Sequence, residues 1–394
     1  MSQLFWYPGY EILIPDIVRG ENGRVFDSAG HSYVDLESGV WCLSLGHAHP
    51  RVTRVLAEQA ATLAHTGYNY THEVVEQGAG EILDLLGFPG GRCVFLCSGS
   101  EAVEYGVRVA RLLLARPLLL TMSDSYFGAY GSAAARRPDE WYDFDWSGCA
   151  ACAQGGGCGP DCERWLAVPF DRIGGFLFEP GSSSGLVRFP PPALIASLAR
   201  RVQEEGGLLL VNEVTTGVGR TGRWFGHQHY PIAPDIAALG KGLGAGYPVA
   251  VAAVSANVSA RLGTTPIRYA QSHQNDPLGA AVAREVLRTI REEGLIERGR
   301  QMGARLWQGL DQLRERTDRI RDLRGRGLMI ALELEDDPQT SFTHRLQREL
   351  ARRGYLVARR PGLSVIRIDP PLTVAREDLD GFLRVLGEIL DAET

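Results

Sequence analysis

The clearest pattern along the chain is a series of short, continuous apolar runs that end at turn-forming or polar residues. Leu118–Met122, Arg172–Phe178 and Leu208–Val211 are of this kind, and another apolar segment follows Pro234-Asp235. Strands that are buried on both faces of a parallel sheet have this appearance. Polar groups at their carboxyl ends face the crevice in which open α/β sheets bind ligands. The pattern therefore predicts an α/β fold with a mostly parallel sheet.

Apolar residues at helical spacing predict helices from Val52 to Leu63, from Val282 to Ile290 and from Leu379 to Ile389. Near the N-terminus, two short alternating runs flank Asp27-Ser-Ala-Gly30, which is typical of a β-hairpin. After Ile320 the chain alternates between short strands and amphipathic helices. We interpret this last part as a small α+β domain that the N-terminal residues complete.

Composition excludes several classes of function. The chain has 394 residues, a net charge of −6 and a pI near 5.9, so nothing indicates a nucleic-acid-binding surface. No apolar run approaches the roughly 20 residues that a membrane span needs. The first eight residues lack the basic start and the cleavage site of a signal peptide. We therefore expect a cytoplasmic protein with neither a nucleic-acid nor a membrane partner.

A single lysine stands out in this arginine-rich chain. Lys241 is its only lysine, and it lies within Gly240-Lys-Gly-Leu-Gly-Ala-Gly246. A lysine among glycines is often no more than a solvated loop residue. The alternative is a buried amine, which loses its charge readily and is suited to Schiff-base chemistry. The absence of other lysines favours this second interpretation.

A candidate phosphate site follows the expected strand at Arg92–Cys97. The sequence Ser98-Gly-Ser-Glu-Ala-Val-Glu104 opens a helix and offers free backbone N–H groups, hydroxyls and the positive end of the helix dipole. The simpler explanation is that Ser100 only caps the helix. If the lysine belongs to a phosphate-bearing cofactor, Gly99 and Ser100 are the expected phosphate ligands.

The stretch around the lysine resembles the class III aminotransferases, which are fold type I enzymes that use pyridoxal 5'-phosphate (PLP). The matching residues are Asn212-Glu213-Val214, Thr216-Gly-Val-Gly-Arg-Thr-Gly222, Pro234-Asp235 and Lys241-Gly-Leu-Gly-Ala-Gly246. A match of this length is far more specific than a lone glycine motif. The resemblance implies a large domain with a mostly parallel seven-stranded sheet, a small α+β domain, and an aldimine between Lys241 and PLP.

The resemblance also assigns roles to residues elsewhere in the chain. Tyr126 would stack on the cofactor ring, and Glu179 would lie beside the active site. Ser272 would reach the phosphate in the partner subunit of a homodimer with shared active sites, and Arg367 would hold the carboxylate of an amino-acid-like substrate. The expected organisation is an N-terminal segment at 1–45 that joins the small domain, a PLP-binding domain at 46–290 and the small domain at 291–394.

Two departures from the family pattern concern the ring of the cofactor. Asn212 stands where the family has an aspartate, and Thr215 stands where it has a glutamine. Asn212, Val214 and Thr215 are still expected to contact the cofactor, but an amide cannot stabilise a pyridinium by charge. Amino transfer is the first expectation. Racemisation or epimerisation, an aminomutase reaction, elimination or replacement, and cyclisation remain alternatives, as does a non-catalytic scaffold with a metal site.

Four cysteines lie in a Gly- and Ala-rich insertion at about 140–165 that the general family pattern lacks. They are spaced Cys149-x2-Cys152-x5-Cys158-x3-Cys162. Four thiolates this close can wrap one tetrahedral ion, so a structural zinc site is the first hypothesis and an iron–sulfur cluster the second. Unconnected thiols or two disulfides are the alternatives.

Overall fold

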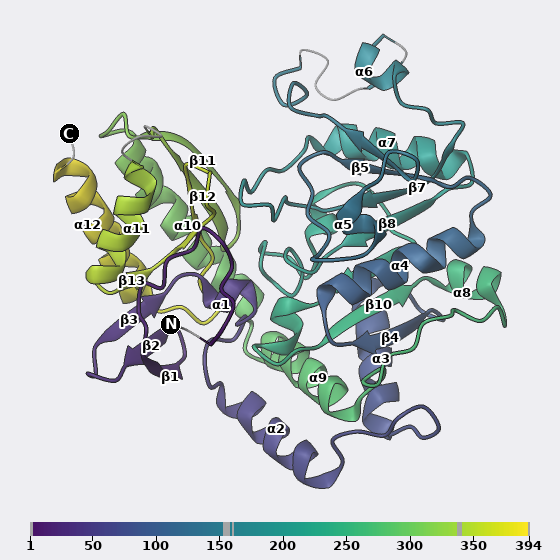
Figure 1. Ribbon diagram of the computed structural model, residues 1–394, viewed down its shortest axis with the longest axis horizontal. Coiled ribbons are helices and arrows are strands. Elements are labelled where there is room, and N and C mark those ends of the chain that lie inside the picture. Colours follow the sequence, from purple (N-terminus) through teal and green to yellow (C-terminus); the bar gives the residue numbers. More distant parts are fainter. Residues whose placement is uncertain (1–2, 153–157, 160, 337–340, 393–394) are drawn as a thin grey trace.

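The computed structural model describes residues 3–152, 158–159, 161–336 and 341–392. Its elements gather into two lobes, and the N-terminal strands lie in the same lobe as the C-terminal helices (Figure 1). Among the described residues, no helix is both long and apolar enough to cross a membrane.

The larger lobe is built on a seven-stranded sheet. Only β10 runs antiparallel to its neighbours, so the other strands all point in one direction, as the apolar runs predict. In spatial order the strands are β4 (Arg92–Leu96), β10 (Ala250–Val254), β9 (Ile236–Leu239), β8 (Leu208–Asn212), β7 (Ile173–Phe178), β5 (Leu118–Met122) and β6 (Trp141–Phe144).

Helices cover both faces of this sheet, and this explains why its strands are apolar throughout. In β8, Leu208 and Leu210 belong to the core cluster that includes α4, while Leu209 and Val211 belong to the cluster that includes α7 and α9. The helices of this lobe are α2 (Pro50–Thr62), α3 (Glu73–Leu86), α4 (Gly99–Leu113), α5 (Ser132–Ala135), α6 (Glu163–Leu166), α7 (Pro192–Glu204), α8 (Ala256–Leu262) and α9 (Pro277–Glu292), with the 3-10 turns η1 (Gly226–His229) and η2 (Lys241–Gly244).

The smaller lobe holds two four-stranded sheets. One consists of β1 (Ile17–Glu21), β2 (Arg24–Asp27), β3 (Ser32–Asp35) and β13 (Tyr355–Leu356); the other consists of β11 (Ile320–Arg326), β12 (Met329–Leu334), β15 (Val365–Ile368) and β14 (Ala358–Arg359). Helices α1 (Ser38–Trp41), α10 (Leu295–Arg314), α11 (Phe342–Arg352) and α12 (Arg376–Ala392) complete the elements. The hairpin predicted around Asp27–Gly30 is confirmed as β2 and β3. Because β13 pairs with β3, the two ends of the chain share one sheet.

Candidate active site

The residues predicted from the lysine, phosphate and ring motifs meet at the carboxyl ends of the parallel strands. Lys241 follows β9, Asn212 ends β8, Glu179 follows β7, and Gly99 lies just beyond β4. A cavity of about 150 Å³ lies between them, and seven of the nine predicted cofactor contacts line it: Gly99, Ser100, Tyr126, Asn212, Val214, Thr215 and Lys241. This is the place in an open α/β sheet where ligands bind.

The amine of Lys241 lies at the centre of this site. Its Nζ donates a hydrogen bond to Oγ1 of Thr215 at 2.7 Å and lies 4.4 Å from the centre of the Trp41 ring. Burial, together with the nearby guanidinium of Arg367, lowers the pKa of the Lys241 amine from 10.5 to about 8. Lys241 is therefore not the solvated loop residue of the simpler interpretation.

The start of α4 forms one end of the cavity. Ser98, and not Ser100, caps the helix: its hydroxyl accepts from the N–H of Glu101, and the Glu101 carboxylate accepts from the N–H of Ser98. The alternative in which Ser100 is only the cap is therefore wrong. The Ser100 hydroxyl instead accepts from the N–H of Ala129 at 3.0 Å and lines the cavity beside Gly99.

Two glycines shape this end of the cavity. A Cβ on Gly99 would lie 2.5 Å from Cγ1 of Val214, and a Cβ on Gly128 would lie 2.5 Å from Oγ of Ser100. Neither position has room for a side chain, and Gly128 also has a φ of +123°. The backbone can thus approach closely around the helix terminus, as an anion site requires.

Tyr126 and Glu179 are linked through the backbone. The N–H of Tyr126 donates to Oε2 of Glu179 at 3.0 Å, and the Ser183 hydroxyl donates to the other carboxylate oxygen. Burial raises the pKa of the Glu179 carboxyl, which these hydrogen bonds and Lys241 partly offset. The Tyr126 ring stays partly exposed and borders the cavity, so a flat ligand can stack against it.

Asn212 is fixed by two backbone contacts. Its Oδ1 accepts from the N–H of Val214 at 3.2 Å, and its Nδ2 donates to the carbonyl oxygen of Tyr126 at 3.1 Å. The second hydrogen of Nδ2 remains available to a ligand in the cavity. At this position the protein offers a neutral donor where the family pattern has a negative charge.

Trp41 is a site residue that the sequence analysis missed. Its indole lies among three cations: Lys241, the Arg367 guanidinium at 3.7 Å and the Arg360 guanidinium at 5.7 Å from the ring centre. Trp41 ends a turn in which residues 38–41 all have positive φ values of 53° to 68°. Hydrophobic periodicity carries no signal for such a left-handed turn, and Gly39 is the only hint of it in the sequence.

Strain in this turn leads to a stability prediction. Val40 has a φ of 58°, and a β-branched residue is unfavourable there by roughly 1–2 kcal/mol. Val40→Gly is expected to raise the free energy of unfolding by about 1 kcal/mol, because glycine adopts this conformation freely. Urea denaturation would measure it. Val18→Gly on the exposed strand β1 is the matched control and is expected to destabilise the protein by about 0.5–1 kcal/mol; equal effects of the two changes would contradict the assignment of strain.

Ser272, predicted to reach the phosphate in the partner subunit, and Arg367, predicted to hold the substrate, have different surroundings. Ser272 is exposed in the segment between α8 and α9, away from the cavity of its own chain. Arg367 is fully buried on β15, where its Nε and Nη2 donate to the two carboxylate oxygens of Asp369 at 3.0 and 2.9 Å. The sequence did not indicate this pairing.

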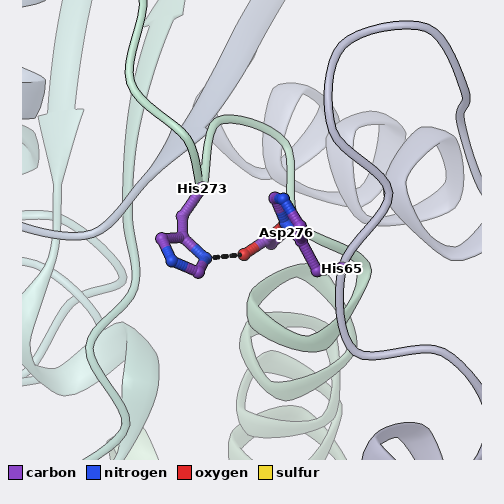
Figure 2. A group of neighbouring side chains, drawn as sticks. All are labelled: His65, His273 and Asp276. Carbon is purple, nitrogen blue, oxygen red and sulfur yellow. Dashed lines mark hydrogen bonds and ion pairs between the residues drawn. The ribbon is translucent and has the colours of Figure 1, made fainter.

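The four cysteines of the insertion do not form a compact ligand set in this conformation. In the part of the chain that the structure describes, one group of three potential ligands has its atoms within 4.8 Å of one another, and it contains no cysteine. That group is His65, His273 and Asp276, and Figure 2 shows the two imidazoles on either side of the carboxylate. Each imidazole hydrogen-bonds one carboxylate oxygen through Nδ1, so the cluster is explained without an ion.

The cavity fits PLP on the evidence of its own residues. It combines a helix start without side-chain crowding, a partly exposed aromatic ring, a neutral amide donor and a half-buried amine of lowered pKa. Together with the seven-stranded sheet, these features define a PLP-dependent enzyme of fold type I.

Comparison with known proteins identifies the family. The family model for class-III aminotransferases matches residues 7–142 and 160–390, so the chain belongs to the class-III aminotransferases, which depend on PLP. The unmatched gap contains three of the four insertion cysteines. An acetylornithine aminotransferase of Mycobacterium tuberculosis is 34% identical over 379 residues, covering 95% of this chain and 91% of the relative. An ornithine aminotransferase of Bordetella pertussis is 30% identical over 404 residues, covering 97% and 92%.

Solved structures agree with this assignment. The crystal structure of an acetylornithine aminotransferase from Elizabethkingia anophelis has a TM-score of 0.83 and 26% identity, with 98% of this chain and 96% of that chain covered. An S-selective transaminase from Arthrobacter has a TM-score of 0.88 at 22% identity, covering 100% of this chain and 96% of its own, and shows the shared fold alone.

Proposed function

We propose that the protein moves the amino group of a primary amine to a carbonyl acceptor, with Lys241 as its catalytic residue. The observation that carries the proposal is the position of the Lys241 amine: it lines one cavity together with Gly99, Ser100 and Tyr126, and it lies beside the ring of Trp41. When bound, PLP supplies the carbonyl that takes up the amino group and the ring that accepts electrons from the reacting carbon.

The protein residues hold and orient the reactants. The start of α4, through Gly99 and Ser100, binds the phosphate, and the ring of Tyr126 supports the cofactor ring. The amine of Lys241 accepts and returns a proton at the reacting carbon. Because its pKa is lowered, a large fraction of this amine is neutral near pH 8 and can act as a base.

The test is a half-reaction without acceptor. The PLP-loaded protein is mixed with an amine donor, and absorbance follows the conversion of the aldehyde form of the cofactor into its amine form. Transfer is supported if the amine form accumulates and a keto acid then restores the aldehyde. Entry of solvent deuterium into the donor without build-up of the amine form would instead indicate racemisation.

The lowered pKa of Lys241 leads to a pH prediction for cofactor loading. Only the neutral amine attacks an aldehyde, so the rate of PLP attachment to cofactor-free protein is expected to rise about tenfold per pH unit below the pKa and to level off above about pH 8. Stopped-flow absorbance measures this rate. The control is Nα-acetyl-lysine in solution, whose side-chain amine is free. A rate that still rises beyond pH 9 would show that the amine is not perturbed.

A homodimer with shared active sites is part of the proposal. Ser272 is exposed, and several large side chains on the surface, including Tyr68, Tyr70 and Tyr130, lie open to solvent in a single chain. Exposed apolar surface of this kind is typical of an interface. Sedimentation equilibrium tests the assembly, and a monomer at micromolar concentration would refute it.

We also propose that the insertion cysteines bind a structural metal, zinc in the first instance, in a cytoplasmic protein that keeps its thiols reduced. Their spacing supports this. Burial raises the pKa of the Cys158 thiol to about 11, and Cys149, Cys162 and Cys152 contribute to the rise, but the four sulfur atoms do not all lie within 4.8 Å of one another. Metal analysis of anaerobically purified protein is expected to find one ion per chain, lost in Cys149→Ser but kept in Cys93→Ser, which lies on β4. Metal-free wild-type protein would exclude the site.

A further inference from the structure

A second and much larger cavity lies beside the one that contains Lys241. Its volume is about 660 Å³, and its walls include the aromatic and aliphatic side chains of Trp6, Tyr7, Tyr10 and Ile12 from the N-terminal segment, together with Trp41. We call this cavity the N-terminal chamber. The two cavities are neighbours: Trp41 lines the chamber and its ring centre lies 4.4 Å from Nζ of Lys241, and Arg360 lines the chamber with its guanidinium 5.8 Å from the centre of the Tyr126 ring.

The size and lining of the chamber indicate a large ligand. Cavities of 300–1,000 Å³ with mainly hydrophobic and aromatic walls accommodate molecules of drug size. A small amino acid would leave most of the chamber filled with water. Apolar walls gain most from a ligand that removes their surface from water.

The buried charges in the chamber wall do not favour a carboxylate. The guanidinium of Arg367 already forms two parallel hydrogen bonds with Asp369, and both side chains are fully buried. A second carboxylate would therefore meet a cation whose charge is already balanced. The half-buried carboxyl of Glu37 also lines the chamber and would repel an anion when ionised.

Two residues that line the chamber each have a buried donor that lacks a partner among the described residues. These donors are Nη1 of Arg367 and Nε1 of Trp41. Buried N–H groups are almost always hydrogen-bonded, so these two are suited to a ligand atom that accepts without carrying a full charge, such as an amide oxygen. Of the other charged groups that line the chamber, Glu11 pairs with His344, Arg359 donates to Oε1 of Gln347, and Arg360 donates to the carbonyl oxygen of Ser183.

We propose that the N-terminal chamber binds the body of the substrate, and that the substrate is a primary amine on a bulky, mainly apolar group that bears a neutral carbonyl oxygen. The inference rests on the proposed amino transfer and narrows its substrate class. It sets this chain apart from relatives whose names specify ornithine and acetylornithine.

The experiment compares primary amines that have the same three-carbon chain next to the reacting amino group. Propylamine, N-acetyl-1,3-diaminopropane and N-(4-phenylbutanoyl)-1,3-diaminopropane differ only in the body that would enter the chamber, and N-acetylornithine adds a carboxylate. The half-reaction gives the second-order rate constant for each amine. The phenylbutanoyl amine is expected to exceed propylamine by about 100-fold, as expected for burial of a phenyl-sized group. It is also expected to exceed N-acetylornithine.

A variant tests whether the chamber causes the preference. Tyr10→Ala removes part of the wall from a segment outside the helices and strands, and it is expected to lower the ratio of the phenylbutanoyl amine to propylamine about tenfold. Trp307→Ala removes an exposed aromatic side chain on α10, outside the chamber, and is the matched control. N-acetylornithine as the best donor, or a ratio that Tyr10→Ala leaves unchanged, would overturn the inference while leaving amino transfer intact.

A different result is expected if the protein does not catalyse amino transfer at all. In that case none of the four amines would convert the cofactor. Equilibrium binding of the same amines would then still test whether the chamber binds large amines. The fluorescence of Trp6 and Trp41, which line the chamber, would follow this binding. Tighter binding of the phenylbutanoyl amine that Tyr10→Ala weakens would support it, and equal binding of large and small amines would overturn it.

Discussion

Lys241→Ala is expected to lower the rate of the amine half-reaction by at least about 10³-fold while the protein stays folded. The substitution removes both the nucleophile that attaches the cofactor and the base at the reacting carbon, and each of these roles contributes by orders of magnitude. Folding should survive because Lys241 is only half-buried beside Trp41, and the lowered pKa of its amine shows that its surroundings disfavour the charge. Stopped-flow absorbance measures the rate of the half-reaction, and circular dichroism shows whether the variant is folded.

Lys241→Arg is the matched control for this prediction. Arginine keeps a positive charge beside Trp41 but does not lose its proton, so it can serve neither as nucleophile nor as base. Equal losses in both variants would assign the effect to amine chemistry, whereas activity in Lys241→Arg would show that the charge alone suffices. Since Lys241 is the only lysine, borohydride reduction should fix PLP to a single peptide of the wild-type protein. Labelling elsewhere would contradict the proposed role.

The sequence predicted the part of the site that depends on strand ends. Each motif around Gly99, Glu179, Asn212 and Lys241 follows an apolar run, and parallel strands bring their carboxyl ends to the same edge of a sheet. The strand ends indicated a common edge of the sheet, and the family resemblance then assigned Gly99 and Glu179 to the site at that edge. The direction of β10 was not predictable in this way, because a buried strand has the same apolar pattern whichever way it runs.

The remaining part of the site depends on contacts that local patterns do not encode. Trp41 reaches Lys241 from a left-handed turn 200 positions earlier in the chain, and no periodicity describes that turn. The pairing of Arg367 with Asp369 is a matter of side-chain direction at the end of β15. The family resemblance marked Arg367 as a carboxylate ligand, but only the structure shows that a carboxylate of the chain itself already occupies it.

Asn212→Asp is expected to destabilise the cofactor-free protein by about 1–3 kcal/mol at pH 8, although it restores the residue typical of the family. In the present structure Nδ2 of Asn212 donates to the carbonyl oxygen of Tyr126 at 3.1 Å. An aspartate would place an acceptor against that oxygen and leave a buried group without a donor. Burial and the facing carbonyl would raise the pKa of the new carboxyl above the unfolded value of about 3.9.

The sign of the pH dependence follows from this raised pKa. The folded variant holds a proton more tightly than the unfolded chain, so its penalty should be small below about pH 4 and should grow as the pH rises through the folded pKa. Urea denaturation at pH 5 and pH 8 measures this penalty, and Asn257→Asp, at an exposed position on α8, is the control expected to change stability by less than about 0.5 kcal/mol. PLP should reduce the penalty, because a protonated ring nitrogen can donate to the new carboxylate. If stability is unchanged at both pH values, the hydrogen bond to the Tyr126 carbonyl oxygen does not explain why position 212 is an asparagine. The reason for the amide would then have to lie in catalysis alone.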